Sequence, residues 1–140
     1  MINRVGVDRA EKTILTCSDD KTARLWSRKD LTLLRTFRVP IKKGNEGKVF
    51  GCDLSPDGKT AALGGWTGWD FERAASVYLY DTATGKMIRR LGPLTDVIQN
   101  ISFSPDGKHL AATLSEGDGL HLYETRTWTV AMTDTDYSGG

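Results

Sequence analysis

A five-residue segment, Ser-Pro-Asp-Gly-Lys, occurs twice in the sequence, at 55–59 and at 104–108. Each copy lies between two short apolar runs. Proline presets the first turn position, aspartate tolerates the next, and glycine takes the left-handed residue that closes a hairpin. Each copy therefore predicts two antiparallel strands. The copies start 49 residues apart, and self-similarity at such a period is typical of a repeat architecture.

A second pattern recurs after each predicted hairpin: small, apolar, variable, Leu, aromatic, polar. It is found at 22–27, 76–81 and 119–124, and the three copies align without gaps. Three copies indicate three units. In the first unit, residues 8–12 stand in place of Ser-Pro-Asp-Gly-Lys and lack its Pro and Gly, so the sequence specifies this turn less well than the other two.

Each unit is predicted to contain four short strands and no helix. The strands carry apolar or small residues at alternating positions on both faces, which is expected of a sheet packed between two neighbours. The unit boundaries are about 4–37, 48–91 and 97–132, and the tail 133–140 is expected to lead into a further unit.

The segment Ser-Asp-Asp-Lys-Thr-Ala-Arg-Leu-Trp at 18–26 resembles the signature of the WD40-repeat β-propeller family. The two hairpin motifs and Tyr-Asp-Thr-Ala-Thr-Gly-Lys at 80–86 are similar to bacterial members, and the resemblance covers nearly the whole chain. It implies an all-β fold: a WD40-like β-propeller fragment of three four-stranded antiparallel blades. Propellers typically have four to eight blades, so we expect the ring not to close within this chain. The chain is then a fragment of a larger propeller or closes by self-association.

The resemblance also implies structural roles for turn residues. Ser18, Asp20 and Trp26 would join the polar network that staples a blade, in which the Asp fixes a tight turn and the indole N–H donates a hydrogen bond. Tyr80 and Tyr123 stand where the other two units would have the Trp, and no Gly-His dipeptide precedes any unit, so this network should be incomplete. The hairpin motifs add four further structural turn residues, namely Asp57, Gly58, Asp106 and Gly107.

Two unusually long links, 38–47 and 65–75, are expected on one rim of the second unit, because the family's topology places links of these two classes on the same face. The candidate partner-binding residues in these links are Trp66, Trp69, Phe71, Lys42 and Lys43. Long loops often carry function, and Trp is enriched at interface hot spots. The alternative is that the aromatic side chains fold back and cover the junction between blades.

Sequence motifs for catalysis are weak. The chain has only two histidines, His109 and His121, in slots that vary between units, and the segment 44–48 lacks the first glycine of a phosphate-binding loop. Residues 134–139 match only the first half of a calcium loop. We expect no catalytic residue, no cofactor and no metal. The alternative is a propeller enzyme or a small-molecule or metal sensor that uses the central channel, for which Asp53 is the one clear candidate and Asn100 a polar neighbour.

Composition limits the classes of partner and the cellular location that the sequence supports. The net charge of +1 gives no argument for nucleic acid or membrane partners, and we see no secretory signal and no run of the ~18 apolar residues that span a membrane. Cys17 and Cys52 are expected to be buried thiols in a reducing compartment, although a disulfide between them is possible. The expected protein is a cytoplasmic, non-catalytic scaffold for protein–protein interaction, a segment of a larger bacterial multidomain signalling or regulatory protein whose partners are proteins.

Overall fold

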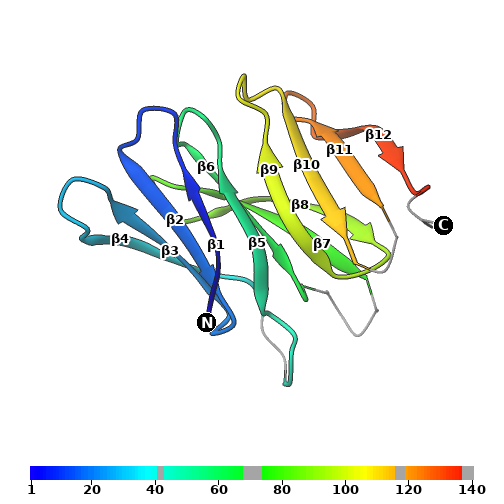
Figure 1. The fold of residues 1–140 in the computed structure, drawn as a ribbon, viewed down its shortest axis with the longest axis horizontal. Helices are drawn as coiled ribbons and strands as arrows, with labels where there is room; N and C mark the ends of the chain where they lie inside the picture. The colour runs from blue at the N-terminus through cyan, green and yellow to red at the C-terminus, as the bar shows by residue number, and fades with distance from the viewer. Residues whose placement is uncertain (41–42, 68–73, 116–118, 137–140) are drawn as a thin grey trace.

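The computed structural model describes residues 1–40, 43–67, 74–115 and 119–136. In this part of the chain the regular structure consists of three four-stranded antiparallel sheets, which we call blades 1 to 3 (Figure 1). In each blade the strands are neighbours in sequence order. The three blades do not close a ring, which confirms the predicted fold class. The described residues include no helix of the length and apolar character needed to cross a membrane.

The strands of each blade are short and joined by turns. Blade 1 contains β1 (Ile2–Val7), β2 (Thr13–Ser18), β3 (Thr22–Ser27) and β4 (Leu33–Arg38). Blade 2 contains β5 (Val49–Leu54), β6 (Thr60–Gly65), β7 (Ala75–Asp81) and β8 (Met87–Leu94). Blade 3 contains β9 (Ile98–Phe103), β10 (His109–Leu114), β11 (Leu120–Glu124) and β12 (Thr129–Asp134).

The core lies between the blades, in two separate clusters of buried side chains. One cluster joins blade 1 to blade 2 and includes Leu15, Phe37 and Tyr80. The other joins blade 2 to blade 3 and includes Leu79 and Ile101. Blade 2 is thus covered on both faces, which explains why its strands carry apolar or small residues at alternating and intervening positions alike.

The first strands of the blades, β1, β5 and β9, lie side by side along the inner edge of the stack (Figure 1). Two glycines allow this close approach. A Cβ atom at Gly6 would lie 2.8 Å from Asp53 Oδ1, and one at Gly51 would lie 2.9 Å from the backbone nitrogen of Ile101. Any larger residue at these positions would have to push the inner strands apart.

The two Ser-Pro-Asp-Gly-Lys segments form the same tight turn. In blade 2 the Ser55 hydroxyl donates to Asp57 Oδ1 at 2.6 Å, the Lys59 N–H donates to the same carboxylate oxygen at 2.9 Å, and Gly58 has φ of 72°. In blade 3 the corresponding residues make the same bonds at 2.6 and 2.9 Å, and Gly107 has φ of 73°.

Blade 1 makes the equivalent turn with different residues. Asp8 replaces the serine, and its Oδ1 accepts a hydrogen bond from the Thr13 N–H at 2.8 Å. Glu11 replaces the glycine and adopts a left-handed φ of 53°, which is uncommon for a residue with a side chain. The first turn therefore keeps the hairpin at the cost of some backbone strain.

Candidate protein-interaction surface

A network of hydrogen bonds closes the turn between β2 and β3 of blade 1. Asp20 Oδ1 accepts from both the N–H and the hydroxyl of Thr22, at 3.0 and 2.5 Å, and Asp20 Oδ2 pairs with the Arg24 guanidinium at 2.8 Å. The Ser18 hydroxyl accepts from the Asp20 N–H at 3.2 Å. These bonds, the Thr22 hydroxyl foremost, hold the pKa of Asp20 below its ordinary value.

The aromatic residues at the end of each third strand use their polar atoms differently. Trp26 Nε1 donates to the Thr16 hydroxyl within blade 1 at 3.0 Å. Tyr80, which stands where the Trp would be in blade 2, donates its hydroxyl to the Arg38 carbonyl at 2.7 Å, and so it ties blade 2 to the end of blade 1. Its ring packs on Phe37, with centroids 5.4 Å apart. Burial raises the pKa of Tyr80 to about 12.

The two long links meet at one end of blade 2, the lower end in Figure 1. The Gly47 N–H donates to the Trp66 carbonyl at 2.7 Å, and the Trp66 N–H donates to the Lys48 carbonyl at 3.0 Å. We call this surface, formed by residues 43–48 and 66–67, the link rim. The shared rim that the family topology implied is thus present where these segments are described.

Trp66 is partly exposed on the link rim, and the residue that follows it anchors the chain. Thr67 is buried, and its hydroxyl donates to the Ser76 carbonyl at 2.6 Å. Trp66 is 45% exposed, and Lys43 is exposed on the facing link. Three of the five candidate binding residues, Lys42, Trp69 and Phe71, lie outside the described residues, so the structure brings only Lys43 and Trp66 to the same rim.

An arginine that sequence reasoning missed clamps blade 1 to blade 2. From β4, Arg35 donates three hydrogen bonds to consecutive backbone carbonyls in the turn between β7 and β8, those of Thr82, Ala83 and Thr84, at 3.0, 2.6 and 3.1 Å. A Cβ atom at Gly85 would lie 2.7 Å from the guanidinium, so a glycine is required beneath it. No short-range pattern marks Arg35, because the turn it holds is 47 to 49 residues away.

Asp53, the candidate for the central channel, has a structural role between the inner strands. Its Oδ2 accepts a hydrogen bond from the Phe103 N–H of blade 3 at 2.8 Å, and its Oδ1 accepts from the Leu54 N–H at 2.9 Å. Burial raises the pKa of Asp53 above its ordinary value, against the opposing effect of these two bonds. Asn100 lies on β9, and its Oδ1 is buried without a hydrogen-bond partner among the described residues.

The two cysteines are free thiols buried at the junction of blades 1 and 2. A hydrogen bond with Cys17, together with burial, raises the pKa of the Cys52 thiol. Both histidines are half-buried. Within the described ranges no group of three His, Cys, Asp or Glu side chains is placed to hold a metal ion.

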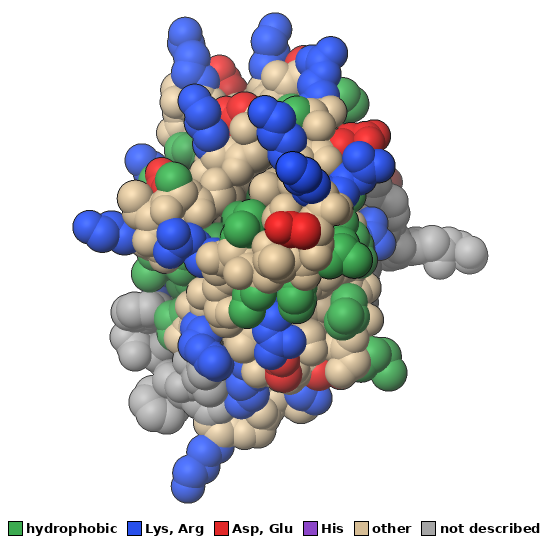
Figure 2. Space-filling view, turned by 90° about the vertical axis from the view of Figure 1, so that its left-hand side faces the viewer, with side chains coloured by type: hydrophobic (Ala, Val, Ile, Leu, Met, Phe, Trp, Pro, Cys, Tyr) green, Lys and Arg blue, Asp and Glu red, His purple; other side chains and the backbone are tan. Residues whose placement is uncertain are grey.

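The faces at the two ends of the stack have no neighbouring blade in the structure. On blade 1, the cross-strand rows that point away from blade 2 contain Val5, Val7, Trp26 and Leu33. Val5, Val7 and Leu33 are 46 to 56% exposed. On the side of the molecule that carries blade 1, hydrophobic side chains gather across the middle, below an end rich in Lys and Arg (Figure 2). At the other end of the stack, Met132 of blade 3 is 47% exposed.

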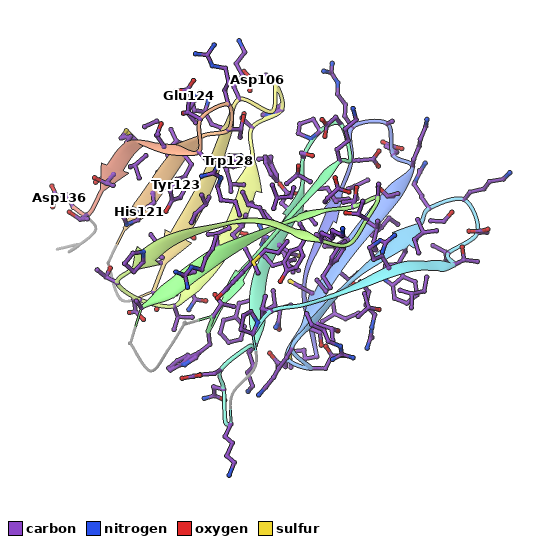
Figure 3. All side chains as sticks on the ribbon, turned by 180° about the vertical axis from the view of Figure 1, so that it is seen from behind. Asp106, His121, Tyr123, Glu124, Trp128 and Asp136 are labelled. Carbon is purple, nitrogen blue, oxygen red and sulfur yellow. The ribbon has the colours of Figure 1, made fainter. Side chains whose placement is uncertain are left out.

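Blade 1 packs on blade 2 with the face that carries Leu25, whereas blade 3 packs on blade 2 with its opposite face, which carries Tyr123. Tyr123 and Trp128 lie on the side of blade 3 that meets β7 and β8 (Figure 3). Tyr123 belongs to the buried cluster and Trp128 packs against it. In β11, Leu122 alternates with Tyr123 and so points to the free face. Leu25 of blade 1 and Leu79 of blade 2 are the equivalents of Leu122, and both are buried at the junction with the next blade.

Sequential four-stranded blades, inner first strands and a core between blades are the architecture of a β-propeller segment, consistent with the WD40-like type. Comparison with known proteins supports this class. The family described as "WD domain, G-beta repeat" matches residues 2–27, which cover β1 to β3 of blade 1.

Two curated relatives from Dictyostelium discoideum are similar to most of the chain. "WD repeat-containing protein 89 homolog" is 28% identical over 124 residues, covering 88% of this chain and 30% of that protein. "Eukaryotic translation initiation factor 3 subunit I" is 28% identical over 130 residues, covering 84% of this chain and 36% of that protein. The chain thus spans about a third of the length of these relatives. Both come from a eukaryote, and the bacterial context stays a prediction.

Proposed function

We propose that this chain is a non-catalytic segment of a WD40-type scaffold that binds a protein partner through the link rim. The observation that carries the proposal is the pairing of the two long links at Gly47 and Trp66. It fixes the backbone that carries an exposed indole, with the Lys43 side chain exposed on the facing link. Rigid, partly exposed Trp side chains are frequent hot spots of protein interfaces.

The other candidate residues extend the same proposal. Lys42, Trp69 and Phe71 belong to the same two links, so we propose that they add basic and aromatic contacts to the binding surface. The turn residues Ser18, Asp20 and Asp57 are proposed to serve the fold alone, since their side chains are engaged in turn hydrogen bonds.

The wider setting is also a proposal. The free faces of blades 1 and 3 would be covered by further blades of a larger cytoplasmic regulatory protein or by a second copy of this chain. The names of the relatives, a WD-repeat protein and a subunit of a translation initiation factor, favour proteins as partners. Nucleic acid and membrane are not proposed, given the net charge of +1.

Site-specific photo-cross-linking tests the link rim. Two variants are expressed in the host cell. A photoreactive amino acid replaces Trp66 in the first variant and Ile88 in the second. Ile88 is a matched control because it is 52% exposed, against 45% for Trp66, and lies on the outer strand β8. We expect a discrete cross-linked protein from position 66 that is absent from position 88. Equal cross-linking from both positions, or none from position 66, would overturn the proposal.

A second measurement separates binding from packing. Trp66→Ala, combined with Trp69→Ala, should reduce the amount of the partner identified by cross-linking that co-purifies with the chain, while the midpoint of thermal unfolding stays nearly unchanged. If the double variant unfolds at a much lower temperature, the aromatic side chains cover the blade junction and the alternative interpretation holds.

A further inference from the structure

A cavity of about 510 Å³ opens at the end of the blade stack opposite the link rim. All three blades contribute to it at the point where their first strands end and the hairpin turns begin (upper end in Figure 1). Its lining residues are Val7, Arg9, Asp53, Leu54, Pro56, Phe103, Ser104, Pro105 and Asp106. The volume lies within the range of roughly 300–1,000 Å³ that ligand pockets occupy. We call it the hairpin cavity.

The walls of the hairpin cavity are fixed by contacts between blades. The Arg9 N–H donates to the Pro56 carbonyl at 3.0 Å, which joins the turns of blades 1 and 2. A Cβ atom at Gly107 would lie 3.5 Å from the Pro56 ring, so that ring rests against the turn of blade 3. The bond from Phe103 to Asp53 joins blades 2 and 3. The cavity is thus preorganised, and little ordering is needed on binding.

Two acidic residues line the hairpin cavity, and the carboxylates of both are held in place before any ligand binds. Asp53 is fixed by the backbone N–H groups of Leu54 and Phe103. Asp106 Oδ1 accepts from the Ser104 hydroxyl and the Lys108 N–H, at 2.6 and 2.9 Å. The labelled position of Asp106 lies at the tip of the hairpin between β9 and β10 (Figure 3). Neither carboxylate forms a salt bridge within the described part of the chain.

The rest of the lining is mainly apolar. Val7, Leu54 and Phe103 come from the inner strands, and Pro56 and Pro105 come from the turns. An apolar pocket that holds two fixed carboxylates suits a side chain with a long methylene stem and a cationic head. Lys and Arg bury their stems against apolar surface and place the charged group on polar partners, and charge-assisted bonds to a carboxylate are the stronger kind.

We propose that the hairpin cavity receives the side chain of a single basic residue, Lys or Arg, carried by an extended segment of a partner protein. The stem lies against Leu54, Phe103 and the prolines, and the head bonds to Asp53 and Asp106. Arg9 also lines the cavity, and its charge disfavours a second basic residue beside the first. This site goes beyond the proposed function, because the cavity and the link rim lie at opposite ends of the inner strands.

Titration of the whole chain with N-acetyl-arginine N-methylamide, followed by amide chemical shifts, tests the site. The matched probe is the citrulline derivative, which has nearly the same shape and no charge. We expect saturable shifts of the Leu54 and Phe103 amide signals, because both N–H groups donate to Asp53. Binding of the citrulline probe should be at least about threefold weaker, the size of a partly exposed ion pair.

The hairpin turns supply a matched pair of variants. Asp57 and Asp106 make the same two turn bonds, but only Asp106 lines the cavity. Asp106→Asn should weaken arginine binding about threefold or more, and Asp57→Asn should leave it unchanged. Absence of saturable shifts, equal binding of both probes, or equal loss in both variants would overturn the proposal. Trp66→Ala should bind the probe normally, because Trp66 lies at the opposite end of the inner strands. A failure of the probe to bind the unchanged protein would therefore leave the link-rim proposal standing.

Discussion

Asp53 and Phe103 join the inner strands of blades 2 and 3 through a hydrogen bond of 2.8 Å from the Phe103 N–H to Asp53 Oδ2. The acceptor is a side chain because the inner strands of neighbouring blades do not share a sheet. A backbone N–H at this junction would otherwise lack a partner. The Asp53 side chain therefore helps to fix the position of blade 3 relative to blade 2.

Replacing Asp53 by Ala removes two acceptors at once. We expect Asp53→Ala to lower the free energy of unfolding by about 1–3 kcal/mol, the usual effect of leaving buried donors unpaired. Asp53→Asn keeps an acceptor and removes a charge whose burial is unfavourable, so its effect should be smaller. Urea unfolding of the two variants measures the difference. A greater loss in the Asn variant would mean that the charge, rather than the acceptor geometry, matters.

Alanine at Gly51 should force the inner strands apart. Its Cβ atom would lie within 3.0 Å of the backbone of Asn100 and 2.9 Å from that of Ile101. Overpacking of this kind typically costs about 1–3 kcal/mol, which thermal unfolding would detect. Gly44→Ala is the control, since nothing lies within 4 Å of its Cβ position and only its left-handed φ of 79° opposes the change. An unchanged midpoint of thermal unfolding in Gly51→Ala would contradict the close approach of β5 and β9.

The Arg35 clamp gives a prediction specific to the junction of blades 1 and 2. Arg35→Ala loses three charge-assisted hydrogen bonds to the turn at 82–84. The side chain is partly exposed, so we expect a loss of about 1–2 kcal/mol in unfolding free energy. Arg89 occupies the equivalent register position of blade 2 and is exposed, and Arg89→Ala should have little effect. A similar loss in both variants would mean that general charge effects dominate.

Acid should weaken the turns. Hydrogen bonds from the Ser55 and Ser104 hydroxyls hold the pKa of Asp57 and Asp106, respectively, below the ordinary value. Their stabilisation is present above the unfolded-state pKa and is lost as the pH falls below about 4. The raised pKa of Asp53 acts in the opposite sense, since its stabilising effect is greatest at acid pH and is lost as the pH rises through its folded-state pKa.

Unfolding free energies measured as a function of pH check both signs. Combining Asp57→Asn with Asp106→Asn should flatten the acid decline, and Asp53→Asn should steepen it. The double variant would contradict this account if it declined as steeply as the unchanged protein below pH about 4.

The blades and their order could be predicted because turns are specified locally. Proline, aspartate and glycine within five residues fix the hairpins at 55–59 and 104–108. The equivalent turn of blade 1 was weakly specified, since Asp8 and Glu11 reach the same geometry by a different carboxylate bond and a left-handed φ. Sequence patterning alone could not have found that substitution.

The bonds between blades could not be predicted, because their partners are far apart in sequence. Tyr80 and the Arg38 carbonyl are 42 residues apart, and Asp53 and Phe103 are 50 apart. The Tyr at position 80 is expected to leave the stapling network of its own blade incomplete, and its hydroxyl bonds to the neighbouring blade. The candidate binding residues were placed on one rim by family topology, and Gly47 and Trp66 meet there. The hairpin cavity had no sequence signal beyond the turns themselves.

Sedimentation over a range of protein concentrations tests whether each blade needs a neighbour on both faces. Association above the monomer mass is expected as concentration rises, because the free face of blade 1 exposes Val5, Val7 and Leu33. Val5→Lys should suppress it, and Ile88→Lys, at a comparably exposed position on β8, should not. A folded monomer at every concentration, unaffected by Val5→Lys, would show that blade 1 needs no neighbour on its free face.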